Sequence, residues 1–168
     1  MDETFRALES EDVEALQALL ESAPQYAEQV TGYPPGPSDA VSSLIGRPEG
    51  LTDDQKYGFG LWVNGELVAF ADVLRGYPTP DAAYIGLLIV RGDRQSSGFG
   101  SRLHAEVLRE ATGWPGIQKL RTGIIETNAA SSERFWVRRG YRPTGEVRPY
   151  QYDKLRSSVA LWELPISR

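Results

Sequence analysis

Residues 83–90, AYIGLLIV, form an almost wholly apolar run that is typical of a β-strand buried on both faces. A turn that contains three glycines follows at 91–100. Leu103, Val107 and Ala111 then recur at helical spacing. This order predicts a buried strand that leads through a tight turn into an amphipathic helix, and it favours a mixed α/β fold.

The residues before this unit predict helices and then a β-hairpin. Leu16 and Leu19 recur at helical spacing behind Ser10, a good helix-capping residue. Asn64-Gly65 stands between two apolar runs, which is the strongest short-range signal for a tight hairpin. Three prolines and two glycines predict a loop at 31–38. We therefore expect helices at 10–20, 26–30 and 39–45 and strands at 57–63 and 66–74.

The residues after the glycine-rich unit continue the alternation of strand and helix. A strand is expected at 120–125, and a helix from Asn128 to Arg139 that Gly140 ends. Two closing strands are expected at 141–147 and 158–164. The sequence contains no internal repeat, and the predicted elements form a single domain over residues 1–168.

The composition excludes several kinds of functional site. The chain has no cysteine, which rules out a disulfide framework, a thiolate metal site and a cysteine nucleophile. Its one histidine, His104, argues against a histidine-rich zinc site, so no metal is predicted. The net charge of −5 argues against broad contact with nucleic-acid phosphates. This charge would suit a cationic amine substrate, although solubility is the preferred explanation for it.

The hydropathy of the chain predicts no membrane contact. The first twelve residues, MDETFRALESED, are acidic and polar, and they match neither a secretory signal nor a transit peptide. No apolar run is long enough to cross a bilayer. We therefore expect a cytoplasmic location.

The turn at 95–101 is suited to hold a phosphate. Because Gly98 and Gly100 lack side chains, an anion can approach the main chain, and the free N–H groups of the first helical turn point at it. Leu103 stands where a dinucleotide-binding G-x-G-x-x-G motif needs its third glycine. The Gly-Lys-Ser/Thr triplet of a Walker motif does not occur. The turn therefore fits neither of these nucleotide-binding motifs.

Two motifs resemble those of the GNAT superfamily of N-acetyltransferases. Residues 95–100, QSSGFG, resemble its Q/R-x-x-G-x-G/A signature, with Val90 five residues before Gln95 as that pattern usually has it. Residues 128–141, NAASSERFWVRRGY, resemble its second motif, in which an asparagine opens a helix that ends in an aromatic pair, basic residues and Gly-Phe or Gly-Tyr. The resemblance is firmest over 84–141. It implies a GNAT-like α/β domain with a central mixed, mostly antiparallel sheet flanked by helices.

The resemblance implies acyl transfer from acetyl-CoA to a primary amine of a small molecule or a peptide. The amine would attack the thioester directly in a ternary complex, and the absence of cysteine agrees with a reaction that has no acyl-enzyme. Dimerisation is common in the superfamily, so a homodimer is an open expectation. The main chain of Leu88, Ile89 and Val90 would pair with the pantetheine arm and supply an N–H to the thioester carbonyl. The other expected coenzyme contacts are Gln95, Ser96, Ser97, Gly98, Phe99, Gly100 and Ser101 around the pyrophosphate, and Asn128 and Ser131 along the arm.

The catalytic acid and base are less well defined by the sequence. Many superfamily members place a tyrosine four residues before the last glycine of the second motif, where it protonates the departing thiolate. Here that residue is Trp136, whose indole N–H is far too weak an acid. Glu126 is the first candidate for a general base that acts through water. Asp81 and Tyr84 come next, with Asp72 behind them, although each also fits a solvated or structural role.

The acceptor region and two alternative functions stay open. Tyr33, Tyr77, Tyr150 and Tyr152 could line an acceptor pocket, and His104 is expected at the surface or boundary of its helix. A non-catalytic acyl-CoA sensor on the same fold is one alternative, because the usual tyrosine is missing. An enzyme that binds a different nucleotide at the same turn is the other.

Overall fold

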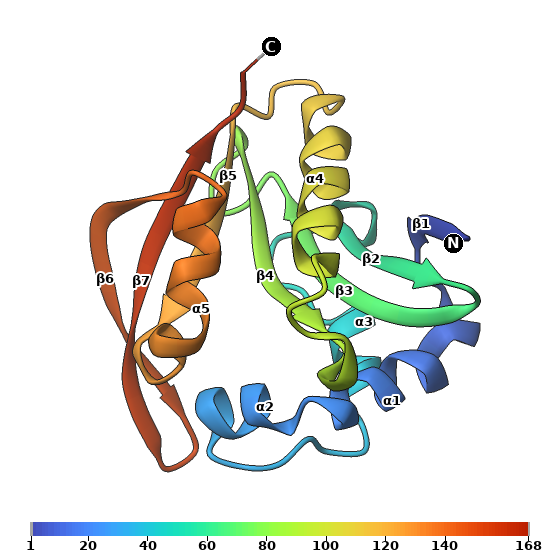
Figure 1. Ribbon diagram of the computed structural model, residues 1–168. Coiled ribbons are helices and arrows are strands. Elements are labelled where there is room, and N and C mark those ends of the chain that lie inside the picture. The colour runs from blue at the N-terminus through green and yellow to red at the C-terminus, as the bar shows by residue number, and fades with distance from the viewer. Residues whose placement is uncertain (1, 168) are drawn as a thin grey trace.

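The computed structural model describes residues 2–167, whose strands form a seven-stranded sheet in the order β1-β2-β3-β4-β5-β7-β6 (Figure 1). All neighbouring strands are antiparallel except β4 and β5, which are parallel. The prediction of a mixed, mostly antiparallel sheet is therefore confirmed. The strands are β1 (Glu3–Ala7), β2 (Lys56–Val63), β3 (Glu66–Arg75), β4 (Ala82–Val90), β5 (Lys119–Ile125), β6 (Arg142–Tyr152) and β7 (Leu155–Pro165).

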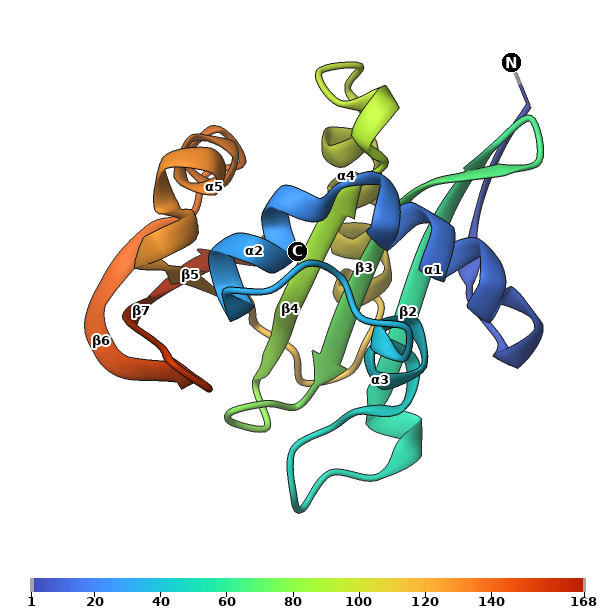
Figure 2. The ribbon, with the colours of Figure 1, turned by 90° about the horizontal axis from the view of Figure 1, so that it is seen from below.

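Helices cover both faces of this sheet (Figure 2). One face carries α1 and α3, which contact β3 and β2, and the opposite face carries α4. α5 packs on β5 and β7 and also contacts α2. Within residues 2–167 no helix is long and apolar enough to cross a membrane. The helices are α1 (Val13–Ser22), α2 (Pro24–Thr31), α3 (Asp39–Ile45), α4 (Phe99–Thr112) and α5 (Glu126–Arg138), with short 3-10 turns at Ser10–Asp12, Asp53–Gln55 and Gly92–Arg94.

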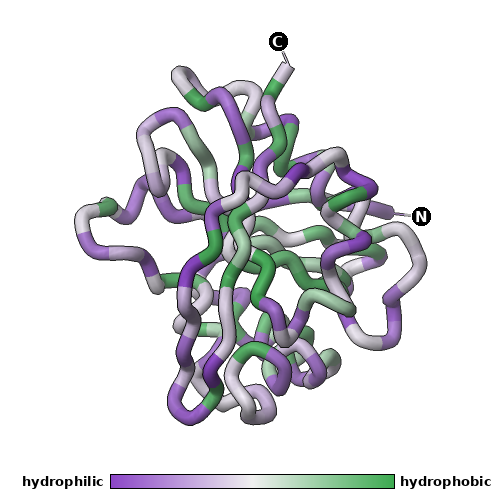
Figure 3. The backbone as a smooth tube through the Cα atoms, turned by 90° about the vertical axis from the view of Figure 1, so that its left-hand side faces the viewer, coloured by the Kyte–Doolittle hydropathy of each residue, from purple (hydrophilic) through white to green (hydrophobic). Residues whose placement is uncertain are grey.

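Two hydrophobic cores lie on the two sides of the sheet, and β3 contributes to both. Ala71 and Val73 belong to the core under α4 together with Leu103, whereas Phe70 belongs to the core under α1 together with Leu16. This division follows from the alternation of side chains along a strand. Figure 3 shows hydrophobic residues along the central strands and hydrophilic residues in many of the outer turns.

The main irregularity of the sheet is the divergence of β4 from β5. The two strands pair only over 82–85 of β4 and 119–122 of β5. Directly afterwards the register between β3 and β4 skips Gly86, which is therefore a β-bulge that bends the strand. The prediction of a strand buried on both faces is wrong for this second half, because Gly86 is exposed and Leu87 is only partly buried.

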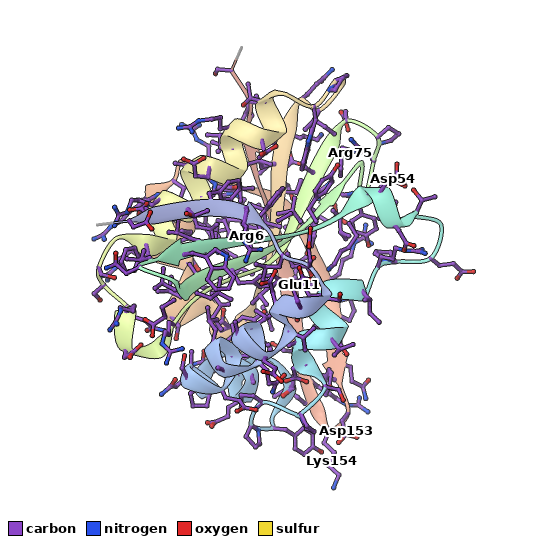
Figure 4. The ribbon with its side chains drawn as sticks, turned by 90° about the vertical axis from the view of Figure 1, so that its right-hand side faces the viewer. Arg6, Glu11, Asp54, Arg75, Asp153 and Lys154 are labelled. Carbon is purple, nitrogen blue, oxygen red and sulfur yellow. The ribbon has the colours of Figure 1, made fainter. Side chains whose placement is uncertain are left out.

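The hairpin between β2 and β3 is confirmed, whereas β1 is not predicted by the sequence. Asn64 and Gly65 have φ angles of +50° and +82°, as a tight hairpin turn requires. The β1 sequence, ETFRA, is mostly polar, and the strand lies at the edge of the sheet. Arg6 of β1 donates two hydrogen bonds to the Asp12 carboxylate at 2.8 and 3.0 Å (Figure 4 labels Arg6). This bidentate pair fixes β1 against the start of α1.

Candidate active site

A cavity of about 980 Å³ lies where β4 and β5 diverge. Its walls come from these two strands, from α2, from the start of α4 and from α5. Three arginines line it, and no aspartate or glutamate is found among its described lining residues. Of the residues predicted for the site, the structure places at this cavity Tyr84, Leu88, Ile89, Val90, Gln95, Ser96, Gly98, Gly100, Ser101, Asn128 and Ser131.

The turn between β4 and α4 presents main-chain N–H groups at one end of the cavity. Gly98 has a φ of +86°, and a Cβ placed on it would meet no atom within 4 Å. The Arg102 amide donates to the Gly98 carbonyl at 3.1 Å, so the amides between them belong to the first helical turn, which lacks intrahelical acceptors. Within the described residues no side chain caps this end of α4. The N–H groups and the helix dipole are therefore available to an anion.

Gly100 permits close packing behind this turn. A Cβ on it would lie 3.1 Å from the Phe135 ring and 3.3 Å from Val90. The same ring carries the Arg139 guanidinium, 5.1 Å from its centroid, and Arg139 donates a hydrogen bond to the Ser101 hydroxyl. A cation that directly follows α5 thus lies beside the first turn of α4. The sequence marks Arg139 only as a charge at a helix end, because its approach to Ser101 depends on how the two helices pack.

Ser97 and Phe99 are the predicted coenzyme contacts whose side chains turn away from the cavity. The Ser97 hydroxyl donates to the main-chain carbonyl of Arg94. The Phe99 ring is buried, and the Arg102 guanidinium lies 4.9 Å from its centroid. In this arrangement each residue offers its main-chain N–H to an anion.

Asn128 and Ser131 connect α5 to α2 at the cavity wall. The Asn128 amide donates to the Gln29 side-chain oxygen at 2.7 Å, and the Gln29 amide donates to the Ser131 hydroxyl at 3.2 Å. The prediction that Asn128 opens the helix is wrong by two residues, since α5 begins at Glu126. The asparagine therefore joins two helices rather than capping one.

Tyrosines and apolar side chains line the other end of the cavity. Tyr26, Tyr84 and Tyr150 reach it from α2, β4 and β6, and Val30 of α2 also lines it. The Tyr150 hydroxyl donates to the Val30 carbonyl. The Tyr84 hydroxyl lies only 2.5 Å from where a Cβ on Gly123 would be, so it reaches the line along which β4 and β5 separate. Burial raises the pKa of Tyr84, which keeps the phenol protonated at neutral pH.

Of the four tyrosines considered for an acceptor pocket, Tyr150 alone lines this cavity. Tyr33 and Tyr152 are exposed, and Tyr77 packs edge-on against Tyr84 with ring centroids 5.6 Å apart. The sequence does not single out Tyr26, because a tyrosine in a short helix carries no pattern that reveals its tertiary neighbours.

All three carboxylates predicted as bases lie outside the cavity lining, and Glu126 and Asp81 are the first two. Glu126 is exposed and is the first residue of α5, directly after β5. Asp81 is partly exposed and accepts a hydrogen bond from the Thr79 hydroxyl at 2.5 Å, which lowers the pKa of Asp81. Both carboxylates could reach a substrate in the cavity only through water.

A third carboxylate, Asp72, lies behind the bulge in β4. Its Oδ2 is 3.5 Å from where a Cβ on Gly86 would be. Asp72 is partly buried and forms an ion pair with Lys56, whose side chain is 6% exposed. Burial raises the pKa of Asp72, although the charge of Lys56 opposes this.

Trp136 occupies the place of the expected tyrosine and is buried at the cavity wall. Its ring meets His104 and Tyr141 edge-on, with centroids 6.1 and 4.9 Å apart. The prediction that His104 lies at the surface or boundary of its helix is wrong, since it is 3% exposed and its Nε2 lies 2.8 Å from the Tyr141 hydroxyl. Burial, together with the charge of Arg139, lowers the pKa of His104 to about 4.

Residues 2–167 hold no cluster of three or more histidine, aspartate or glutamate side chains that could bind a metal ion.

Comparison with known proteins agrees with this geometry. The model of the acetyltransferase (GNAT) family matches residues 14–141, whereas no curated protein matches the chain. The ribosomal-protein-S18-alanine N-acetyltransferase from Escherichia coli superposes with a TM-score of 0.71 at 22% identity, over 99% of this chain and 96% of that one. An acetyltransferase from Thermus thermophilus gives 0.74 at 22% identity, over 98% and 97%. An N-acetyltransferase from Staphylococcus aureus gives 0.74 at 20% identity, over 99% and 100%.

At these identities the solved structures establish the fold alone. The family model covers most of the chain, supports acetyl transfer as the general reaction and implies acetyl-CoA as the co-substrate. The chain belongs to the GNAT acetyltransferase family.

Proposed function

We propose that this protein transfers an acyl group, in the first place acetyl, from coenzyme A to a primary amine. The observation that carries the proposal is the open main-chain turn at Gly98, at the end of a cavity lined by arginines and by no carboxylate among its described residues. The diphosphate would accept hydrogen bonds from the first-turn amides of α4 and from Arg139, which already reaches Ser101.

The second half of β4 is the proposed platform for the pantetheine arm. Residues 86–90 have no pairing to β5, so their main-chain groups on that side are available to a ligand. An extended amide chain can bind such an edge as an added strand does. From Val90 back to Gly86 the strand spans about 13 Å. An arm anchored at the turn and laid along this edge would bring the thioester close to Gly86 and Tyr84.

The proposed reaction is direct attack of a neutral amine on the thioester carbonyl. A bond forms between the amine nitrogen and the carbonyl carbon, the carbon–sulfur bond breaks, and coenzyme A leaves as a thiolate that must be protonated. Tyr84 is the proposed proton donor because it lines the cavity and is protonated at neutral pH. It would regain its proton from water. Trp136 cannot take this role, since an indole N–H is not acidic enough.

The proton that the attacking amine loses would go to a carboxylate through water. Glu126, Asp81 and Asp72 are the candidates for this base, and all three stand outside the cavity lining, so each would act through water. Asp72 is favoured because it lies behind Gly86, close to where the thioester is proposed to sit, and because burial raises its pKa.

A primary amine with an apolar or aromatic body fits the proposed acceptor end best. Tyr26, Tyr84, Tyr150 and Val30 offer apolar surface with a few hydroxyl groups. The acceptor in the name of the Escherichia coli relative is a protein alanine. A free peptide terminus therefore belongs in any test beside small amines.

A non-catalytic acyl-CoA sensor is the second candidate function, favoured by one observation, the tryptophan at position 136. Thiol release from acetyl-CoA, measured with aromatic amines, polyamines, amino acids and peptides with free N-termini, separates the two. The proposal expects turnover with at least one of these acceptors. Saturable acetyl-CoA binding without turnover for every acceptor would overturn it in favour of the sensor.

A further inference from the structure

Two arginines on α5 line the cavity without an ion-pair partner. Arg134 and Arg138 are both exposed, and their spacing of four residues puts them on one face of the helix. No carboxylate among residues 2–167 pairs with either one. Arginines on the other side of the turn are already engaged, because Arg91 pairs with Asp93 at 3.0 Å and Arg94 pairs with Glu66 at 3.1 Å.

The positive charge of Arg134 and Arg138 is unusual for a chain that is acidic overall. The chain carries a net charge of −5, yet the charged residues described in the cavity lining are all arginines. The diphosphate proposed for the turn would be met by the first amides of α4 and by Arg139. Arg134 lies more than one helical turn before Arg139, about 7 Å along the axis. Arg138 shares the helix face of Arg134 and points about 100° around the helix axis from Arg139. The pair therefore suits a second anionic group, set apart from the diphosphate.

We propose that Arg134 and Arg138 bind the 3′-phosphate of the coenzyme A ribose. This inference rests on the proposed function, since it names the form of coenzyme that the site recognises. The 3′-phosphate is a dianion outside the diphosphate, and guanidinium groups bind phosphate oxygens through charge-assisted hydrogen bonds. The protein would thereby distinguish coenzyme A from 3′-dephospho-coenzyme A.

Calorimetric titration with these two compounds tests the assignment. Wild-type protein is expected to bind coenzyme A about tenfold more tightly than 3′-dephospho-coenzyme A. In the double variant Arg134→Gln/Arg138→Gln this preference should fall below about threefold, while affinity for the dephospho form stays within about twofold of wild type. Because both side chains are exposed, the unfolding midpoint should not change.

A matched control separates this contact from the general charge of the surface. Arg142→Gln/Arg156→Gln removes the same two charges from exposed positions outside the cavity lining and should keep the tenfold preference. Equal binding of the two compounds by wild-type protein would overturn the inference. The inference also fails if Arg134→Gln/Arg138→Gln keeps the preference for coenzyme A, or if this variant loses affinity for both compounds to the same extent. If the dephospho form binds but shows no disadvantage, the 3′-phosphate assignment alone fails, whereas absence of binding by both compounds overturns the proposed function itself.

Discussion

At the residue scale, the proposed anion site depends on Gly98, which combines a left-handed backbone with empty space where a Cβ would lie. In Gly98→Ala the new methyl group would occupy the volume assigned to the diphosphate, so we expect the Kd for acetyl-CoA to rise about tenfold or more. The left-handed φ should also cost about 1 kcal/mol of unfolding free energy. Calorimetric titration and urea unfolding measure the two effects.

Gly116 provides the matched control for this variant. Its φ is +81°, a Cβ on it would also meet no atom within 4 Å, and it does not line the cavity. Gly116→Ala should therefore lose similar stability and bind acetyl-CoA like wild type. If both alanine variants weaken binding to the same extent, backbone strain explains the effect and the anion site at Gly98 is wrong.

Tyr84 is the residue on which the proposed proton transfer depends. Tyr84→Phe removes only the hydroxyl, so we expect kcat to fall about 100-fold with the Kd for acetyl-CoA unchanged. Adding Trp136→Tyr to this variant places a phenol where many superfamily members have one, and it should restore part of kcat. Steady-state thiol release measures both variants. An unchanged kcat in Tyr84→Phe would remove this tyrosine from the mechanism.

His104 predicts a specific loss of stability in acid. Its pKa is about 4 in the folded protein and 6.5 in a model peptide, so between these values the unfolded chain binds more protons. The contribution of His104 to the free energy of unfolding should therefore be fully present above pH 6.5. It should decrease by about 3 kcal/mol as the pH falls towards 4. His104→Gln keeps a hydrogen-bonding group for Tyr141 but cannot titrate in this range. Urea unfolding at both pH values should show the extra loss in wild type alone, and equal losses would contradict the assignment.

At the element scale, the glycine-rich turn is held in place by α1. The Gly92 amide donates to the Ser22 hydroxyl at 3.0 Å, and a Cβ on Gly92 would lie 1.9 Å from the Ser22 carbonyl oxygen. Gly92→Ala must therefore separate the turn from α1. We expect a loss of about 2–3 kcal/mol in unfolding free energy and weaker acetyl-CoA binding.

Gly113, at the other end of α4, is the control for this prediction. A Cβ there would lie 3.4 Å from the Glu110 carbonyl oxygen, an ordinary contact. Thermal unfolding and titration of Gly113→Ala should resemble wild type. Wild-type stability and affinity in Gly92→Ala would show that the contact with α1 does not support the turn.

The elements that local chemistry determines are the ones that the sequence predicts. Asn64-Gly65 defines its hairpin, and the stripe through Leu103 and Val107 defines α4, because turn residues and apolar spacing act over a few neighbours. No local sequence pattern predicts the divergence of β4 from β5, because it depends on which strands pair in the sheet. β1 escapes prediction because an edge strand with polar residues lacks a clear alternation.

The candidate site shows the same division. Gly98 and Gly100 can be predicted because a phosphate-binding turn needs residues without side chains at fixed positions. Arg139, Tyr26 and the buried His104 cannot, because each owes its place to the packing of one helix against another. The acid–base residues remain a proposal for the same reason, since the structure puts Tyr84 on the cavity but leaves Glu126 at the surface.

At the scale of the whole molecule, the sheet and the helices on its two faces surround the cavity between β4 and β5. α1 and α3 support one face, α4 supports the other, and α5 with β6 and β7 encloses the space that β4 and β5 leave between them (Figure 1). The chain is acidic overall, whereas the charged residues described in the cavity lining are basic. This arrangement favours an anionic coenzyme that enters from outside.

The most direct test of this account is calorimetric titration of the wild-type protein with acetyl-CoA, NAD and ATP under identical conditions. We expect micromolar binding of acetyl-CoA and binding of NAD and ATP that is about 100-fold weaker or more. At about 100 times its Kd, acetyl-CoA should also stabilise the folded protein by about 2.7 kcal/mol. Tighter binding of NAD or ATP, or no detectable binding of acetyl-CoA, would contradict the assignment of the turn at Gly98 to coenzyme A.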